Sequence, residues 1–410
     1  MSKLAINGGS KAVTGGYPGW PIWDESDVQA VVDVVRSGHW WSVGGAKVPE
    51  FERTFAEYQG AKYGVCVPNG TISLLVALQA VGIKAGDEVI VTPYTFIASA
   101  SAIVQANAIP VFVDVDLETF NIDPKQIEAA ITDKTKAIMA VHIGGMPADM
   151  DAIMDIAGRH NLKVIEDAAQ AHGASWKGRG VGSIGDIGSF SFQASKNLTS
   201  GEGGIVITSD QDIADIAWSI HNVGRKKGGA WYEHLVLGCN YRMTEFQAAI
   251  LLNQFKKLDA ETKLRNENGQ YLAARIGKID GIVPQKRDER VTSHAYHIFP
   301  LRYTLGDTNG VHRDKILQAL NAEGVPSSLG YLPLYRAGTF ELSPDECPMG
   351  CRFYGRTQDY QNMNLANCER LSDHESIWLS QNMMLADRGR IDEIADAFEK
   401  VMENIDELKG

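Results

Sequence analysis

The chain has 410 residues, of which 44% are hydrophobic and 22% are charged, and its formal net charge is -12 at pH 7. Length and composition are ordinary for a globular enzyme of two domains, and the acidic balance argues against nucleic acid or an anionic membrane as the main partner. No apolar leader follows Met1 and no run of about 18 apolar residues occurs, so we expect a cytoplasmic protein that acts on a small molecule.

The five cysteines do not have the pattern of a disulfide framework, because their number is odd and most lie far apart. Cys347 and Cys351 are close together, with Cys368 downstream, but this is not the spacing of a zinc site and no fourth ligand is evident. We therefore expect reduced thiols and no bound metal.

The first predicted helix begins at Ser26, where Gln29 three residues later completes a capping box, and it ends at Gly38. The next loop carries Trp40 and Trp41. These two side chains would cover a pocket, meet another subunit, or pack under a neighbouring helix.

Short apolar strands then alternate with helical stretches. Strands are expected at 63–67, 88–91, 111–115, 137–141, 163–166 and 204–208, and helices at 72–81, 97–105 and 125–131. This order is typical of right-handed βαβ units, so it predicts an α/β fold with a mostly parallel central sheet and helices on both faces.

A long helical pattern at 244–276 follows a shorter one at 211–220 and could bridge two lobes. Beyond it we expect a smaller α+β domain with a strand at 297–303 and helices at 312–323 and 391–408. We place the large domain, with its N-terminal arm, at 1–265 and the small domain at 266–410.

Lys196 follows the alternating sequence SFSF at 189–192 and precedes GEGG at 201–204. A buried strand would fix the lysine, while the glycines would let backbone pass close to a bulky planar group. A lysine whose pKa is lowered by partial burial or a nearby cation becomes nucleophilic and forms Schiff bases. The alternative is an ordinary lysine that extends into solvent.

Asp167 lies in the sequence IEDAAQAHGA at 165–174, which reads as the end of a buried strand. Ligands bind at the carboxyl ends of strands in open α/β sheets, and a carboxylate there can pair with the protonated ring nitrogen of a pyridine cofactor. A helix cap or a structural ion pair is the alternative. Upstream, Asn69, Gly70 and Thr71 separate a strand from a helix, where backbone amides form either a phosphate site or an ordinary cap.

These motifs occur in a specific order: PNGTISLL, YTFIAS, IEDAAQAHGA, SFSFQASKNLTSGEGG and GCNYRMTEFQAAIL. Together, from about Trp23 to about Asn253, they resemble the DegT-type aminotransferases, which act on keto-sugars and keto-cyclitols. The resemblance implies the fold-type-I scaffold with pyridoxal 5′-phosphate (PLP) as cofactor.

The resemblance also implies how the phosphate of PLP is held. Gly70 and Thr71 match the pair that binds it, with help from Ser191. Asn240 matches a residue that reaches the same phosphate from the neighbouring subunit, so the resemblance implies a homodimer with shared active sites.

The ring of PLP is implied to contact four further residues. Phe96 matches the aromatic side chain that stacks on it, although Phe96 alone would be taken for a core residue. Gln170 matches the side chain near the ring hydroxyl, Asp167 the partner of the ring nitrogen, and Lys196 the Schiff-base lysine that also moves the proton.

Transfer of an amino group from L-glutamine or L-glutamate to a keto acceptor is the function implied. Gln193, and the sequence QNMMLA at 381–386, favour a keto-cyclitol of the scyllo-inosose type. The alternative acceptor is a nucleotide-linked 3-keto or 4-keto sugar, whose diphosphate Arg225, Lys226 and Lys227 could bind. A non-catalytic regulatory protein on the same fold is a more distant alternative.

Overall fold

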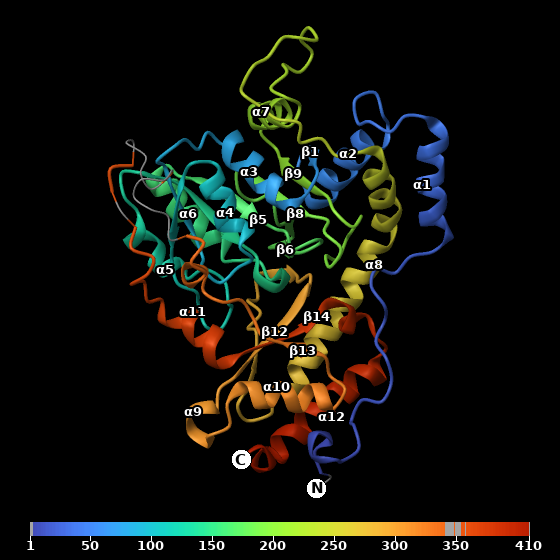
Figure 1. Cartoon of the computed structure of the whole chain (residues 1–410), viewed down its shortest axis with the longest axis vertical. Helices are drawn as coiled ribbons and strands as arrows, with labels where there is room; N and C mark the ends of the chain where they lie inside the picture. Colours follow the sequence, from blue (N-terminus) through green and yellow to red (C-terminus); the bar gives the residue numbers. More distant parts are fainter. Residues whose placement is uncertain (1–2, 341–347, 349–353, 357, 410) are drawn as a thin grey trace.

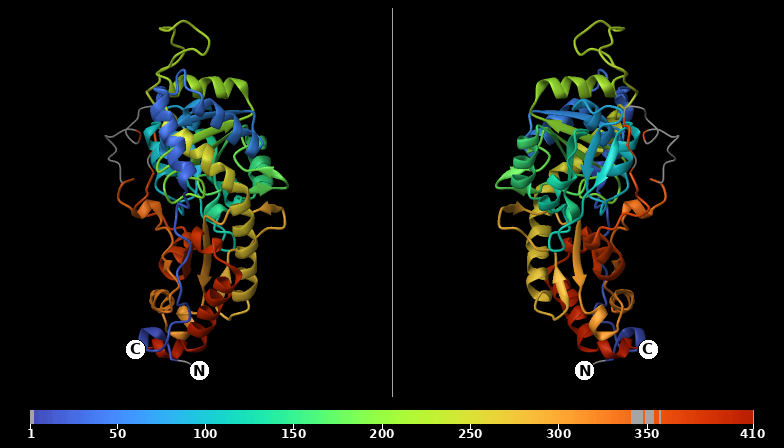
Figure 2. Two further views of the ribbon diagram at one scale, coloured as in Figure 1. Left: turned by 90° about the vertical axis from the view of Figure 1, so that its right-hand side faces the viewer. Right: turned by 90° about the vertical axis from the view of Figure 1, so that its left-hand side faces the viewer.

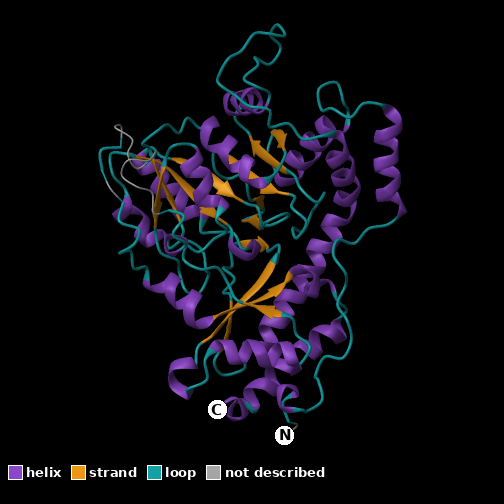
Figure 3. Cartoon of the chain, viewed as in Figure 1, coloured by secondary structure: helices purple, strands orange, loops and turns teal. Residues whose placement is uncertain are grey.

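The computed structural model describes residues 3–340, 348, 354–356 and 358–409. A larger part surrounds a seven-stranded sheet and a smaller part is built on a four-stranded sheet, with the long helix α8 (Glu245–Ile276) running from one to the other (Figure 1). Figure 3 shows the two groups of strands, with helices packed around each.

The large sheet confirms the predicted α/β class. Its strand order is β1 (Tyr63–Val67), β9 (Gly204–Thr208), β8 (Ile187–Ser191), β5 (Lys163–Asp167), β4 (Thr135–Val141), β2 (Glu88–Val91) and β3 (Ile109–Phe112). The pairs β5–β8, β4–β5, β2–β4 and β2–β3 are parallel.

Two strands differ from the sequence prediction. β9 is antiparallel to both β8 and β1, because a loop without a crossover helix joins β8 to β9 and returns the chain in the opposite direction. β3 was expected at 111–115 but pairs from Ile109, and Pro110 is accommodated because β3 lies at the sheet edge.

Helices cover both faces of the large sheet. One apolar core contains side chains of α3 (Gly70–Ala80), α4 (Ala98–Gln105) and α7 (Gln211–His221), and the other contains side chains of α2 (Lys47–Gln59), α6 (Met150–His160) and the first half of α8. The short helix α5 (Pro124–Ile127) precedes β4. Alternate residues of β2 enter opposite cores, as a strand buried on both faces requires.

The first helix, α1 (Glu25–Ser37), has a different cap from the one predicted. Asp24 is the N-cap and accepts a hydrogen bond from the Ser26 amide at 2.8 Å, while Asp27 accepts one from the Asp24 amide at 3.0 Å. Asp24 at the N-cap and Asp27 three residues later form the capping box, and both accept these bonds with full charges near the positive end of the helix. Gly38 ends the helix in the left-handed conformation, as predicted.

The smaller part has an antiparallel sheet of order β10 (Ile282–Pro284), β12 (Ile298–Tyr303), β14 (Ser376–Ser380) and β13 (Ser327–Ser328). Its helices are α9 (Gly306–Asn309), α10 (Arg313–Ala322) and α12 (Arg388–Glu403), whereas α11 (Ala366–Arg370) packs on the larger part, where Cys368 enters a core of the large sheet. A third, small sheet joins β11 (Val291–Ser293), β6 (Ser175–Trp176) and β7 (Arg179–Gly180).

The N-terminal segment packs on the smaller part, and both chain ends lie there (Figures 1 and 2). Leu4 and Val13 enter its core, and the buried carboxylate of Glu323 accepts hydrogen bonds from the amides of Ala5 and Ala12 at 2.8 and 2.9 Å. A division of the chain at 265/266, which we propose, falls inside the continuous helix α8.

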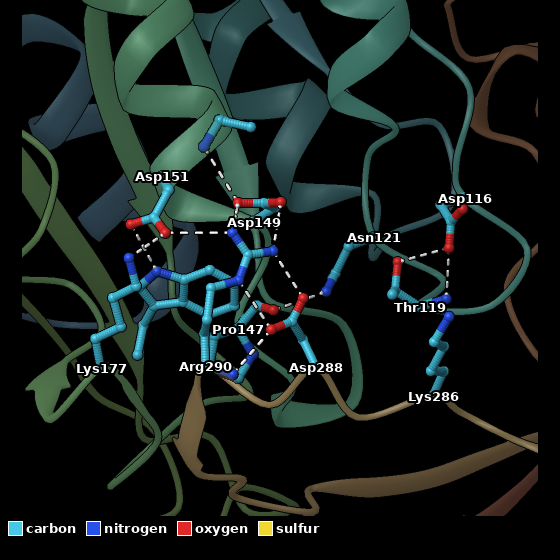
Figure 4. Close-up of polar contacts among 12 residues, drawn as sticks. Asp116, Thr119, Asn121, Pro147, Asp149, Asp151, Lys177, Lys286, Asp288 and Arg290 are labelled. Carbon is cyan, nitrogen blue, oxygen red and sulfur yellow. Dashed lines mark hydrogen bonds and ion pairs between the residues drawn. The ribbon is translucent and has the colours of Figure 1, made fainter.

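An ionic cluster centred on Arg290 ties the small sheet to the large part (Figure 4). The guanidinium donates to Asp149 at 2.8 Å, to Asp288 at 2.7 Å and to Asp151 at 3.2 Å, and it lies 4.4 Å from the centre of the Trp176 ring. The two parts therefore meet through a charged network as well as through apolar contacts.

Within the described residues, no helix is long and apolar enough to cross a membrane, and no group of three or more histidine, cysteine or acidic side chains could hold a metal ion. Cys347 and Cys351 lie outside the described residues, whereas Cys368 is a buried free thiol.

Candidate active site

A cavity of about 790 Å³ opens beside the carboxyl ends of the central strands and the N-terminus of α3. Seven of the eight predicted site residues line it: Gly70, Thr71, Phe96, Asp167, Gln170, Ser191 and Lys196. The structure therefore brings together side chains that lie more than a hundred residues apart in the sequence.

The N-terminus of α3 forms one wall. Asn69 is its N-cap, with the side chain accepting from the Ile72 amide at 3.0 Å, while the amides of Gly70 and Thr71 have no acceptor among the described residues. A Cβ on Gly70 would lie 2.6 Å from the Ser191 Cβ, so only glycine allows α3 and β8 to approach this closely. Free amides at a positive helix end, next to a hydroxyl, are suited to an anion.

Asp167 ends β5 and is buried below the cavity. Its carboxylate accepts from the Ser99 hydroxyl at 2.7 Å and from the Ala169 amide at 3.2 Å. Burial nevertheless raises the pKa of this carboxyl, because these hydrogen bonds and the charge of Lys196 only partly offset the loss of solvent. A cationic ligand group would relieve that cost.

Glu166, the adjacent residue, serves the opposite face of the sheet. Its buried carboxylate accepts from the amides of Gly182, Ile184 and Gly185, each at 2.7 Å, and contacts His142 at 3.0 Å. Burial would raise the pKa of Glu166, but these contacts hold it below its ordinary value. Because successive side chains of a strand point to opposite faces of the sheet, Glu166 has a structural role on one face while Asp167 reaches the cavity on the other.

Lys196 lies in the loop between β8 and β9. Gln193 holds this loop, since its side-chain oxygen accepts from the amide and the hydroxyl of Ser195 at 2.9 and 2.7 Å. Phe190 and Phe192 anchor the preceding strand by edge-to-face contacts with Phe55 at 4.9 and 5.3 Å.

The Lys196 amine is easier to deprotonate than that of an ordinary lysine. Burial lowers its pKa to about 8, although the charge of Asp167 acts in the opposite direction. This is the property that a Schiff-base lysine needs.

Phe96 and Gln170 complete the predicted set on the cavity wall. Phe96 is 57% exposed, which is unusual for a phenylalanine and rules out the core role that its residue type alone would favour. Gln170 is buried, with its oxygen accepting from the Gly144 amide at 2.7 Å and its nitrogen donating to the Tyr331 hydroxyl at 2.8 Å.

Ser99, His297 and Tyr331 are among the residues of the cavity wall that the sequence prediction missed. Ser99 could have been found, because it follows Phe96 by three residues on the same stretch. His297 and Tyr331 come from the smaller part and belong to no motif. Burial and the charge of Lys196 hold the pKa of His297 well below its ordinary value, so its ring stays neutral.

Asn240 is the one predicted residue that does not line this cavity. It is exposed in the segment between α7 and α8, which protrudes from the large part (Figure 1). Among the described residues of a single copy, Asn240 forms an isolated antiparallel bridge with Asn222.

Comparison with known proteins decides the family. Residues 21–363 match the model of the DegT/DnrJ/EryC1/StrS aminotransferase family, and they include every predicted site residue. The chain belongs to this family. It is therefore a PLP-dependent aminotransferase, and the resemblance seen in the sequence is confirmed.

Individual relatives support this assignment. Over the full length of both chains, 42% of residues are identical to a Streptoalloteichus tenebrarius protein named for a proposed L-glutamine:3-amino-2,3-dideoxy-scyllo-inosose aminotransferase activity. Over 82% of each chain, 41% are identical to the L-glutamine:2-deoxy-scyllo-inosose aminotransferase of Streptomyces lividus. The crystal structure of 3-amino-5-hydroxybenzoic acid synthase superposes with a TM-score of 0.85 at 34% identity, covering 96% of this chain and all of that one.

The cavity fits PLP on independent grounds. The backbone at Gly70, which has no side chain, and the amides at the start of α3 are suited to bind a phosphate. The exposed face of Phe96 is suited to stack on a planar ring. The buried carboxyl of Asp167 would be stabilised by a cation, which a pyridinium nitrogen would supply.

Proposed function

We propose that the enzyme transfers the amino group of L-glutamine or L-glutamate to a keto-cyclitol of the scyllo-inosose type. The observation that carries this proposal is the charge of the cavity wall, on which Lys196 is the only cationic side chain among the described residues. A nucleotide diphosphate would call for arginine or lysine, whereas a neutral polyhydroxylated ring calls for amides and hydroxyls. Relatives named for scyllo-inosose substrates support the same acceptor.

The phosphate-binding and ring-binding roles are assigned as follows. Gly70 and Thr71 would bind the phosphate through their amides, with the Ser191 hydroxyl beside them. Phe96 would stack on the ring, and Asp167 would pair with the ring nitrogen and keep it protonated. Bound PLP supplies the electron sink that stabilises negative charge on the carbon next to the donor's nitrogen.

Lys196 carries both covalent attachment and proton transfer in this proposal. Its amine would hold the cofactor at rest and be released when the amino donor binds. The free neutral amine would then take the proton from the donor's Cα. Hydrolysis by water would release the donor as a 2-oxo acid, and its amino group would remain with the bound cofactor. With a keto acceptor the same groups act in reverse, and the carbonyl becomes an amine.

The active form is proposed to be a homodimer with shared sites. Apolar side chains of the protruding segment are exposed, with Leu237 at 98% and Tyr232 at 84%, and Trp40 and Trp41 are about half exposed. Such surfaces call for a partner. A second copy could bring Asn240 to the phosphate.

Complementation tests the shared sites. Lys196→Ala and Asn240→Ala should each be inactive alone, whereas mixed dimers should regain part of the wild-type rate because one of their two sites is intact. A wild-type enzyme that sediments as a monomer while active would contradict the dimer proposal.

The acceptor is tested with enzyme loaded with pyridoxamine 5′-phosphate. The loaded enzyme is offered scyllo-inosose, 2-deoxy-scyllo-inosose, and a panel of nucleotide-linked 3-keto and 4-keto sugars, and aminated products are followed by mass spectrometry. We expect products from the cyclitols. Products from the nucleotide sugars alone would refute the cyclitol assignment and favour the alternative acceptor.

A further inference from the structure

The side chain of Gln170 has a fixed orientation. The Gly144 amide donates to its Oε1 at 2.7 Å, and because a backbone N–H can only donate, the carboxamide oxygen must face Gly144. A Cβ on Gly145 would lie 2.7 Å from the Gln170 carbonyl oxygen, so the backbones on both sides are also in close contact. Gln170 Nε2 therefore points away from Gly144.

Gln170 Nε2 donates to the hydroxyl oxygen of Tyr331 at 2.8 Å. The hydrogen of that hydroxyl must then point elsewhere, and it has no acceptor among the described residues. Since Tyr331 lines the cavity, the open direction for this hydrogen is toward a bound molecule.

The ring of Tyr331 is held firmly, although the residue comes from the smaller part. It makes edge-to-face contacts with Trp378 at 4.7 Å and with Tyr94 at 5.8 Å. Burial raises the pKa of Tyr331, and the charge of Asp167 adds to this effect. The hydroxyl thus stays protonated at physiological pH and acts as a donor rather than a base.

The family resemblance implies that Gln170 lies near the ring hydroxyl of the cofactor. We propose that the Tyr331 hydroxyl is a second donor beside Gln170 Nε2, and that the two bind one oxygen atom of the molecule held in the cavity. The oxygen is one that bears negative charge, in full or in part. This inference rests on the proposed function, which brings two such oxygens here: the ring oxygen of the cofactor and the carbonyl oxygen of the keto acceptor. Tyr331 would couple the small domain directly to the reacting molecule.

Tyr331→Phe removes only the hydroxyl oxygen and leaves the ring contacts in place. The matched control is Tyr335→Phe, four residues further on. The hydroxyl of Tyr335 donates to Glu369 at 2.8 Å and accepts from the Leu365 amide at 3.2 Å, and Tyr335 does not line the cavity.

The first measurement is a pH titration of the visible absorbance of bound PLP. If the ring oxygen is the ligand, Tyr331→Phe shifts the midpoint about 1 to 2 pH units upward, because a lost hydrogen bond to a charged oxygen disfavours the deprotonated form. This measurement needs only cofactor binding, so it tests the site even if the cyclitol assignment fails.

The second measurement is the rate at which enzyme loaded with pyridoxamine 5′-phosphate aminates the keto acceptor. If the carbonyl oxygen is the ligand, the rate falls about 10- to 100-fold while the absorbance midpoint stays unchanged. The inference is overturned if Tyr331→Phe changes neither quantity, or if Tyr335→Phe changes them equally. Failure of wild-type enzyme to aminate any cyclitol would instead count against the proposed function.

Discussion

The close contact between Gly70 and Ser191 makes Gly70→Ala a sharp test of the phosphate site. The new methyl carbon would lie 2.6 Å from the Ser191 Cβ and 2.9 Å from its Oγ. Carbon atoms pack at about 3.5 to 4.0 Å, so α3 and β8 must separate by roughly 1 Å. Overpacking of this kind costs about 1 to 3 kcal/mol, whereas replacing glycine in a helix returns up to about 1 kcal/mol.

The free energy of unfolding of Gly70→Ala should therefore fall by roughly 0 to 2 kcal/mol, while its phosphate site is displaced. We expect the dissociation constant for pyridoxamine 5′-phosphate to rise about 10- to 100-fold, which corresponds to about 1.4 to 2.8 kcal/mol. Calorimetric titration of the cofactor-free enzyme measures this constant. Pyridoxamine without phosphate is the ligand control, and its affinity should fall much less.

Gly158→Ala is the matched protein control. Gly158 lies inside α6, and a Cβ there meets no atom within 4 Å. This variant should be about 0.5 to 1 kcal/mol more stable than wild type, with cofactor affinity unchanged. Equal cofactor affinity in Gly70→Ala and wild type would refute the assignment of the phosphate site.

Three further outcomes are expected. Asp167→Asn should lower kcat about 100-fold or more. It should also stabilise the cofactor-free protein to heat at pH 7, because the pKa of Asp167 is raised in the folded protein and its ionised form therefore opposes folding above the pKa of the unfolded chain. Lower stability of the variant at pH 7 would contradict this. The rate at which PLP attaches to the cofactor-free enzyme should rise with pH and level off above about pH 8. At pH 7 the neutral fraction of Lys196 should be roughly 300 times that of an ordinary lysine. A rate that still rises through pH 10 would show that the pKa of Lys196 is not lowered. Arg290→Met should lower the free energy of unfolding by about 1 to 2 kcal/mol without changing activity. The effect is modest because the carboxylates that Arg290 binds are about one third exposed and are screened by solvent. Added salt should reduce the difference in stability between the variant and wild type.

Most strands and several helices of the larger part were predictable because they have a clear local pattern, whereas α2 and α6 were not predicted. The apolar run of β2 and the glycine after α1 mark their ends directly in the sequence. The direction of β9 was not predictable in the same way, because an apolar run carries no sign of strand direction. Only the absence of a helix between β8 and β9 indicated it.

The candidate site was predictable where chemistry and sequence order coincide. Lys196, Asp167 and Gly70 lie in motifs whose residue types match the needs of one cofactor, and the structure places them around one cavity. Tyr331 and His297 could not be found this way, because they belong to no motif and reach the cavity only through the folding of the smaller part. The role of Asn240 depends on a second copy of the chain, so it stays a prediction.

Reduction with borohydride tests the central claim most directly. Holoenzyme treated with borohydride should carry the cofactor permanently attached to one peptide, and mass spectrometry after digestion should place the added mass on Lys196. Lys196→Ala treated in the same way should carry no added mass and should have no aminotransferase activity. Attachment to any other lysine in the active wild-type enzyme would contradict the account.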